Sequence, residues 1–231
     1  MAKTHCHLVF SLLALAMVRS LSAKCANANQ LLGMKELTEK DKKALLEIHN
    51  KFRQLAASGK AFGSQPRAQN MLELTWDEHA ARQAYDWASK CQWEHNQPKD
   101  ENDNSLGQNL ASKGSTKQLN VHKTFDKWMK GMVRAWYNEV NLYEFGSAFS
   151  AKTGHYTQLV WATTAKLGCG YSYYKEIDGG TTWYTGYLVC NYNPAGNWNE
   201  EDPYVTGNQN CSGFGLVKSK NYGALCVKKG N

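Results

Sequence analysis

Proline and long apolar runs are both scarce in this chain of 231 residues. It has four prolines, and no repeat or low-complexity stretch appears. The one long apolar run, residues 8–18, stands at the extreme N-terminus, so no integral membrane span is expected in the body of the chain. The remaining composition, with 42% hydrophobic residues and a mean hydropathy of −0.60, is typical of a soluble globular protein. The length allows one well-cored domain or two small ones.

A strong excess of one charge is also missing, as are two catalytic motifs. The 27 lysines and arginines against 20 acids leave a formal net charge of +7 that is spread along the chain. Such a modest excess predicts no nucleic-acid partner. Neither HExxH, which places two zinc ligands and a base on one helical face, nor the GxSxG turn of serine hydrolases occurs. The sequence therefore gives little support to an enzyme.

The N-terminal apolar run has the pattern of a secretory signal peptide. Lys3 precedes it, and Arg19 and the small residues up to Ala23 follow it. We expect residues 1–23 to be removed and the protein to be secreted to the extracellular space; an uncleaved anchor or a buried helix is the alternative. Cleavage also removes Cys6 and lowers the net charge from +7 to +5, because Lys3 and Arg19 leave with it.

Six cysteines remain after that cleavage, which fits three disulfides formed in an oxidising compartment. They are Cys25, Cys91, Cys169, Cys190, Cys211 and Cys226. Proximity along the chain favours Cys190 with Cys211. Cys91, at a helix end, could reach Cys169 on the first strand of the hairpin. Cys25 and Cys226 would then join the two termini. Asn210 begins the only N-x-S/T sequon and is a candidate glycosylation site, although a cysteine occupies its middle position.

Helical patterns come first along the chain and strand patterns later. Thr38, with Asp41 three residues on, predicts the start of a first helix, and Thr75 with Glu78 predicts the start of a second. A third helix is expected over residues 123–141. Residues 166–174 and 182–192 are aromatic and β-branched, with glycines between them, which predicts a hairpin. This order favours one α+β domain with an antiparallel sheet.

Two long motifs and several short ones carry a family resemblance. GHYTQLVWATT (154–164) and YLVCNYNPAGNW (187–198) look like the two signatures of the CAP superfamily, also called SCP/TAPS; His49-Asn50 with Arg53, CQWEHN, GQNLA and WYNEV occur in the family's order. The chain most resembles the venom-allergen-like proteins that parasitic worms secrete. This resemblance implies an α-β-α sandwich with a central three-stranded antiparallel sheet over residues 37–198. Residues 24–36 would form an N-terminal segment and residues 199–231 a short disulfide-tethered extension.

The resemblance also implies a polar cavity with two histidines and two glutamates. Carried over by motif, these are His95, His155 and Glu139, but Gln108 stands where the family has its other glutamate. Two imidazoles and one carboxylate are a sufficient set for Zn²⁺, and Gln108 would orient a histidine or a water. Losing a carboxylate weakens cation attraction, so we expect no required cofactor and at most weak zinc binding. The alternative is a hydrogen-bonded cluster that ties helices to the sheet.

Lipid binding is the function that the resemblance favours, because sterols and fatty acids are bound by many secreted members. The aromatic candidates lie in the stretch of chain from the end of the third helix to the GHYTQ motif. They are Trp136, Tyr137, Tyr143, Phe145 and Phe149. We expect a mobile loop that carries exposed rings, with closure of the main core by these rings as the alternative.

Two other functions stay open. The first is a protein-interaction or immunomodulatory module that binds a host extracellular protein without lipid cargo. The second is a metal-dependent hydrolase, in which Glu139 beside a metal-bound water would act as base, and this has the weaker support. Channel regulation is not expected, because only two cysteines follow Trp198, too few for the additional domain of that branch.

Overall fold

The structure is a computed structural model that describes Cys25 and residues 28–230. The expected signal peptide at residues 1–23 and Cys6 lie outside the described residues. The helices are α1 (Glu39–Ala57), α2 (Glu78–Ala88), α3 (Val121–Asn138) and α4 (Gly154–Leu159), with 3-10 turns η1 (Phe62–Ser64), η2 (Glu139–Asn141) and η3 (Cys211–Phe214). The strands are β1 (Gln30–Met34), β2 (Thr75–Trp76), β3 (Gly107–Ser115), β4 (Lys166–Asp178), β5 (Thr181–Asn193), β6 (Leu216–Lys218) and β7 (Cys226–Lys228). In this part of the chain, no helix combines the length and the apolar character that crossing a bilayer requires.

The predicted hairpin is confirmed and forms the centre of the main sheet. β4 and β5 pair antiparallel over their whole length and turn at Gly179 and Gly180, whose φ angles of +55° and +77° suit glycine. β3 pairs antiparallel with the other edge of β5. β1 pairs antiparallel with β4, and the two-residue β2 pairs parallel with it. The expected three antiparallel strands are thus present, and two short strands extend the sheet to five.

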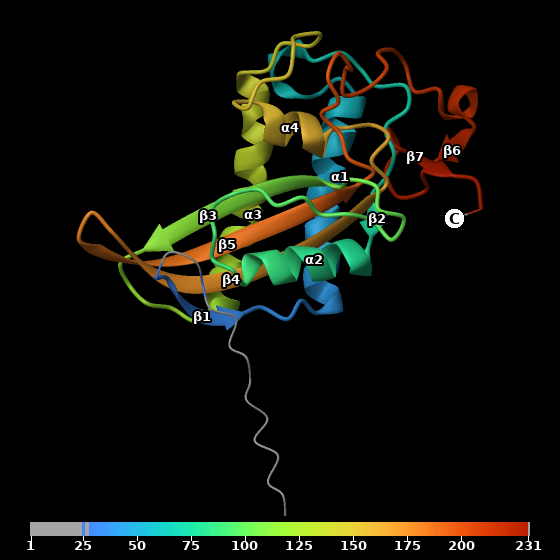
Figure 1. Cartoon of the computed structure of the whole chain (residues 1–231). Coiled ribbons are helices and arrows are strands. Elements are labelled where there is room, and N and C mark those ends of the chain that lie inside the picture. The colour runs from blue at the N-terminus through green and yellow to red at the C-terminus, as the bar shows by residue number, and fades with distance from the viewer. Residues whose placement is uncertain (1–24, 26–27, 231) are drawn as a thin grey trace, which may run out of the picture.

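Helices cover both faces of this sheet, which confirms the predicted α-β-α sandwich (Figure 1). α2 lies against β4 so closely that a side chain at Gly168 or Gly170 would collide with its backbone. On the opposite face, a side chain at Gly186 would collide with Tyr171 and with Trp128 of α3. The large core cluster joins α1, α3 and α4 to that second face, and a smaller cluster lies between α2 and the first.

Capping residues fix where the first two helices begin. The predicted start of α1 is confirmed, because Thr38 and Asp41 form a reciprocal capping box. The predicted cap of α2 is wrong. Thr75 pairs with Lys166 in β2, and Asp77 caps the helix by accepting the N–H groups of His79 and Ala80 at 3.0 and 3.1 Å.

A buried arginine holds the turn after α4 against α1. Arg53 is fully buried and donates five hydrogen bonds, of 2.7–3.2 Å, to main-chain carbonyl oxygens. The acceptors are Leu72, Leu159, Trp161, Ala162 and Thr164. Burial lowers the pKa of the guanidinium to about 9, so it stays charged at neutral pH. One side chain thereby satisfies carbonyl groups of the irregular turn, of which Trp161 and Ala162 also accept a main-chain N–H, from Thr164 and Leu72.

All six expected cysteines form disulfides, but the predicted pairing is wrong. The bonds are Cys25–Cys91, Cys169–Cys190 and Cys211–Cys226. Cys169 and Cys190 stand directly opposite each other in the β4–β5 ladder, at the register that the turn at Gly179 and Gly180 sets. Cys25 reaches Cys91 near the end of α2, where the side chain of Asn29 also donates to the Cys91 carbonyl at 3.2 Å.

The C-terminal residues are therefore not tethered to the domain by a disulfide, because Cys211–Cys226 closes within them. Main-chain hydrogen bonds join them to the domain instead: Cys226 donates to Met71 and accepts from Glu73, each at 2.8 Å. Leu225 and Tyr204 are buried in the main core. Asn210 is exposed, and its side-chain oxygen accepts from the N–H of Gly213 at 3.2 Å. Its glycosylation stays a prediction.

Candidate functional site

The first half of the polar cavity is a hydrogen-bonded unit around Gln108, near the start of β3. The Gln108 amide oxygen accepts from Nδ1 of His95 at 3.1 Å and from the main-chain N–H of Asn96 at 3.3 Å. Its amide nitrogen donates to the side-chain oxygens of Asn96 and Asn191 at 2.6 and 3.0 Å. Because an amide oxygen only accepts, the bond to His95 requires the proton on Nδ1. Gln108 therefore contacts His95, and its role in orienting that ring stays a prediction.

The second half pairs Glu139 with His155. Glu139 follows α3 directly, and one carboxylate oxygen accepts from Nδ1 of His155 at 2.6 Å. The other oxygen accepts the main-chain N–H groups of His155 and Tyr156 at 3.0 and 3.1 Å. The carboxylate therefore satisfies donors in the first turn of α4 and sets the direction of the imidazole ring. The indole of Trp136 stacks on that ring, with centroids 6.2 Å apart.

A buried chain of hydrogen bonds supports the site from behind. The Asn109 amide donates to the His155 carbonyl at 3.0 Å and to the Tyr192 hydroxyl at 3.1 Å. That hydroxyl lies 3.1 Å from Nε2 of His49, whose Nδ1 lies 2.7 Å from the Leu45 carbonyl. Burial lowers the pKa of His49 to about 4, so the ring is neutral at pH 7. Its Nδ1–H donates to Leu45, and Nε2 accepts from Tyr192. His49 is thus a buried, hydrogen-bonded structural residue.

His95 and His155 face one cleft of about 420 Å³, together with Gln108 and Phe149. Gly107 and Gln158 also line it, and any side chain at Gly107 would collide with the Gln158 amide. Gln158 in turn accepts the main-chain N–H of Gly196 at 2.9 Å. The two signature motifs therefore meet at the wall of this cleft.

The geometry does not fit a zinc ion held by His95, His155 and Glu139. Among the described residues, no group of three or more His, Cys, Asp and Glu side chains is placed to hold a metal ion. Both oxygens of Glu139 are used by His155 and Tyr156, and Gln108 engages His95. The arrangement is two oriented imidazoles in one cleft, each with its Nδ1 already in a hydrogen bond.

The structure separates the five aromatic residues that the sequence grouped as a lipid loop. Trp136 is buried and donates its indole N–H to the Leu110 carbonyl at 2.8 Å. Tyr137 is also buried and stacks on Phe52, with centroids 4.1 Å apart. Tyr143 is buried, and Phe145 packs on Tyr204. The fifth ring, Phe149, is 57% exposed. Core closure, the alternative left open above, therefore describes most of this set.

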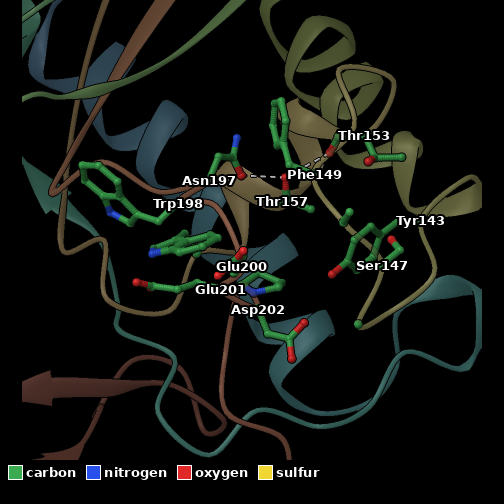
Figure 2. A pocket seen from close by; sticks show the side chains of 14 residues that line it. Tyr143, Ser147, Phe149, Thr153, Thr157, Asn197, Trp198, Glu200, Glu201 and Asp202 are labelled. Atoms are coloured by element: carbon green, nitrogen blue, oxygen red, sulfur yellow. Dashed lines mark hydrogen bonds between the residues drawn. The ribbon is translucent and has the colours of Figure 1, made fainter.

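Phe149 also lines a second cleft, of about 330 Å³, that four aromatic rings surround (Figure 2). Tyr143, Trp161 and Trp198 are the other three. The hydroxyl of Thr157 donates to the side-chain oxygen of Asn197 at 2.7 Å within its wall. Three consecutive acids, residues 200–202, line one side. We refer to this space as the aromatic cleft.

Sequence reasoning missed Trp161 and Trp198 as binding candidates. Both lie inside the signature motifs, where they served only to identify the motif. Trp198 is 52% exposed, which is unusual for so large an apolar ring. Asn197 adopts a φ of +59° and donates to the Gly154 carbonyl at 2.9 Å. The turn thereby brings the end of one signature beside the start of the other.

Sequence relatives place this arrangement among known proteins. The profile of the family described as CAP, Cysteine-rich secretory protein family, matches residues 46–192. Salivary antigen-5 of Triatoma infestans is 54% identical, over 99% of this chain and 98% of that protein. Venom allergen 5 of Vespula vidua is 42% identical, over 73% of this chain and 81% of that protein. These relatives are salivary and venom proteins.

Solved structures agree with the sequence relatives. The crystal structure of NaASP2 with Zn²⁺ aligns with 87% of this chain and 99% of its own, at 26% identity and a TM-score of 0.62. Schistosoma mansoni venom allergen-like protein 4 aligns with 75% of this chain and 98% of its own, at 28% identity and a TM-score of 0.53. The resemblance to worm venom-allergen-like proteins is thus confirmed, although the insect salivary and venom proteins share more identity. With its signature motifs, sandwich fold and matched profile, the chain belongs to the CAP family of cysteine-rich secretory proteins.

Proposed function

We propose that this protein is a secreted, non-enzymatic carrier that binds sterols or fatty acids in the aromatic cleft. The observation that carries the proposal is the exposure of Phe149 and Trp198, at 57% and 52%, on the lining of one cavity. Exposing large apolar rings to water is unfavourable by about 25 cal/mol for each Å². A lipid that covers both rings removes that cost.

The dimensions and chemistry of the cleft support a small amphipathic ligand. Its volume of about 330 Å³ is comparable with the lower end of known ligand pockets. The rings of Tyr143 and Trp161 continue the apolar wall inward from Phe149 and Trp198. A rigid, mostly apolar ligand gains from such preformed walls because little side-chain ordering is required on binding.

The acids beside the cleft favour sterols over fatty acids. Glu200, Glu201 and Asp202 line the same space as the four rings. Their carboxylates accept a hydrogen bond from a sterol hydroxyl, whereas they repel the carboxylate of an ionised fatty acid. We therefore expect cholesterol to bind more tightly than palmitate at neutral pH, with the difference shrinking as salt rises.

The polar cleft with the two histidines has a structural role in this proposal. The His95–Gln108 and His155–Glu139 pairs connect the loop after α2, strand β3 and helix α4. No cofactor is required, and a divalent ion binds weakly to the imidazoles at most. The proposal includes no hydrolytic step, since neither the HExxH nor the GxSxG motif occurs in the sequence.

Solvent extraction of the protein from its secretory route tests the proposal without mutations. Mass spectrometry of the extract should reveal co-purified sterol in amounts approaching one molecule for each protein. Delipidated protein should then take up labelled cholesterol saturably. An extract without lipid, combined with unsaturable cholesterol uptake, would contradict the proposal.

A second function, docking of a host extracellular protein, is supported by a separate apolar surface. Phe62 in η1 and Leu142 just after η2 are 66% and 71% exposed. The two turns are joined, since the side-chain amide of Gln65 donates to the Tyr143 carbonyl at 2.9 Å. Capture of one defined extracellular protein that is lost in a Phe62→Ser/Leu142→Ser variant would support this function.

A further inference from the structure

The outward face of α3 carries a stripe of four cations that the lipid-binding proposal does not use. They are Lys123, Lys127, Lys130 and Arg134, and all four are exposed. At 100° for each residue, spacings of four, seven and eleven place them within an arc of about 60°. With a rise of 1.5 Å for each residue, the stripe is about 16 Å long. We call this set the α3 stripe.

The charge of this face differs from that of the chain as a whole. α3 has four lysines and arginines against a single acid, Asp126, whereas the whole chain has 27 against 20. None of the four cations lies within ion-pair distance of an acidic group among the described residues. On α1, by contrast, Lys43 lies 3.8 Å from Glu47 and Lys42 lies 2.8 Å from Glu39.

The α3 stripe is also held on a rigid support. The opposite side of the helix is buried in the main core through Phe125, Trp128, Met132 and Trp136. The Trp136 indole is further fixed by its hydrogen bond to Leu110. The backbone spacing of the cations is therefore preset, and only their flexible side chains need ordering when a partner binds.

We propose that the α3 stripe binds a sulfated polysaccharide. A linear polyanion can follow a straight row of cations. Each contact between a cation and the polyanion releases condensed counterions into the solvent, which favours binding. Sulfate groups stay ionised wherever lysine and arginine are charged, so the charge complementarity does not depend on pH near neutrality.

An anionic membrane and a nucleic acid fit this face less well. The large apolar side chains of α3 are buried, and the exposed residues beside the cations are His122, Asp126, Gly131, Ala135 and Asn138. The face thus offers no large apolar side chain to insert into a bilayer, and its one exposed ring is the imidazole of His122 at the first turn. Three disulfides further indicate an oxidising, extracellular setting, where sulfated polysaccharides are the abundant linear polyanions.

Binding to immobilised heparin as a function of salt tests the proposal on the whole secreted protein. The test variant is K123Q/K127Q/K130Q/R134Q. The matched control, K152Q/K218Q/K220Q/K229Q, removes the same charge from exposed lysines elsewhere. Equal thermal unfolding temperatures of the variants show that both are folded.

The expected result is a large loss confined to the test variant. Its Kd for heparin should rise more than about tenfold near physiological salt, and the slope of log K against log salt should fall by about 3. The control should bind as the wild type does, and desulfated heparin should not bind. Equal losses of heparin binding in both variants, or no loss in either, would overturn the proposal. It would also be overturned if the test variant lost binding to phosphatidylserine vesicles or to single-stranded DNA but bound heparin as the wild type does.

Discussion

The carboxylate of Glu139 holds Nδ1 of His155 at 2.6 Å and caps the first turn of α4 with its other oxygen. The same side chain would be a metal ligand in a zinc-binding arrangement of this site. In this structure both of its oxygens accept hydrogen bonds from protein donors. In this account the polar cleft connects α3 to α4, and the aromatic cleft binds the lipid. A substitution in the polar cleft should therefore affect stability rather than lipid binding.

Replacing Glu139 by glutamine should therefore destabilise the fold without abolishing lipid binding. Glutamine keeps one acceptor oxygen but places an N–H₂ group against the remaining donors. We expect a loss of about 1–3 kcal/mol in the free energy of unfolding, measured in urea. Cholesterol affinity of the folded variant should change little. Glu144→Gln, at an exposed position, is the control and should unfold as the wild type does.

Replacing Gln108 by glutamate should strengthen zinc binding. The new carboxylate would stand beside His95 and facing the cleft that His155 lines, adding a negative charge and an oxygen donor. Calorimetric titration should show a lower zinc Kd for Gln108→Glu than for the wild type, and His95→Ala in the same background should remove the gain. Identical heats for wild type and both variants would show that these residues hold no metal.

Buried His49 should make the fold sensitive to mild acid. Burial lowers its pKa from the ordinary value of 6.5 to about 4 in the folded state. Between these two pH values the unfolded state therefore binds a proton that the folded state does not bind. Stability should thus be complete above pH 6.5 and fall by up to about 3 kcal/mol as pH drops toward 4. Urea unfolding at several pH values measures this slope. A His49→Gln variant should be less stable at pH 7 but should lose less on acidification; parallel curves would contradict the assignment.

Arg53 should be among the most sensitive positions of the chain. Replacing it by methionine leaves five main-chain carbonyl groups without their donor in a buried region. We expect a loss of more than about 3 kcal/mol, while Lys51→Met on the exposed face of α1 should change stability by less than about 0.5 kcal/mol. A loss at Arg53 no larger than that at Lys51 would show that water replaces the guanidinium.

The sequence was sufficient for the fold class, through the family motifs, and for the start of α1, whereas the predicted cap of α2 at Thr75 is wrong. The capping box of Thr38 with Asp41, and the turn at Gly179 and Gly180, each depend on residues that are close together in the sequence, so both can be predicted from it. The disulfide prediction is wrong because it relied on chain separation and ignored strand register. Counting outward from the turn at Gly179 and Gly180 places Cys169 opposite Cys190.

The aromatic residues show the same limit. Trp136 and Tyr137 were grouped with Phe149 by proximity along the chain, yet helical periodicity places Trp136 on the buried side with Trp128 and Met132. That spacing favours a place in the core for Trp136. The pairing of Phe149 with Trp198 joins residues 49 positions apart and follows only from the turn at Asn197.

Saturation binding of labelled cholesterol to a Phe149→Ala/Trp198→Ala variant tests the central claim most directly. The account predicts that its Kd rises at least about tenfold, because two rings lose their contact with the ligand. A Phe62→Ala/Phe214→Ala control, which removes two exposed rings outside the aromatic cleft, should bind as the wild type does. Unchanged cholesterol affinity in a folded Phe149→Ala/Trp198→Ala variant would contradict the assignment of the aromatic cleft.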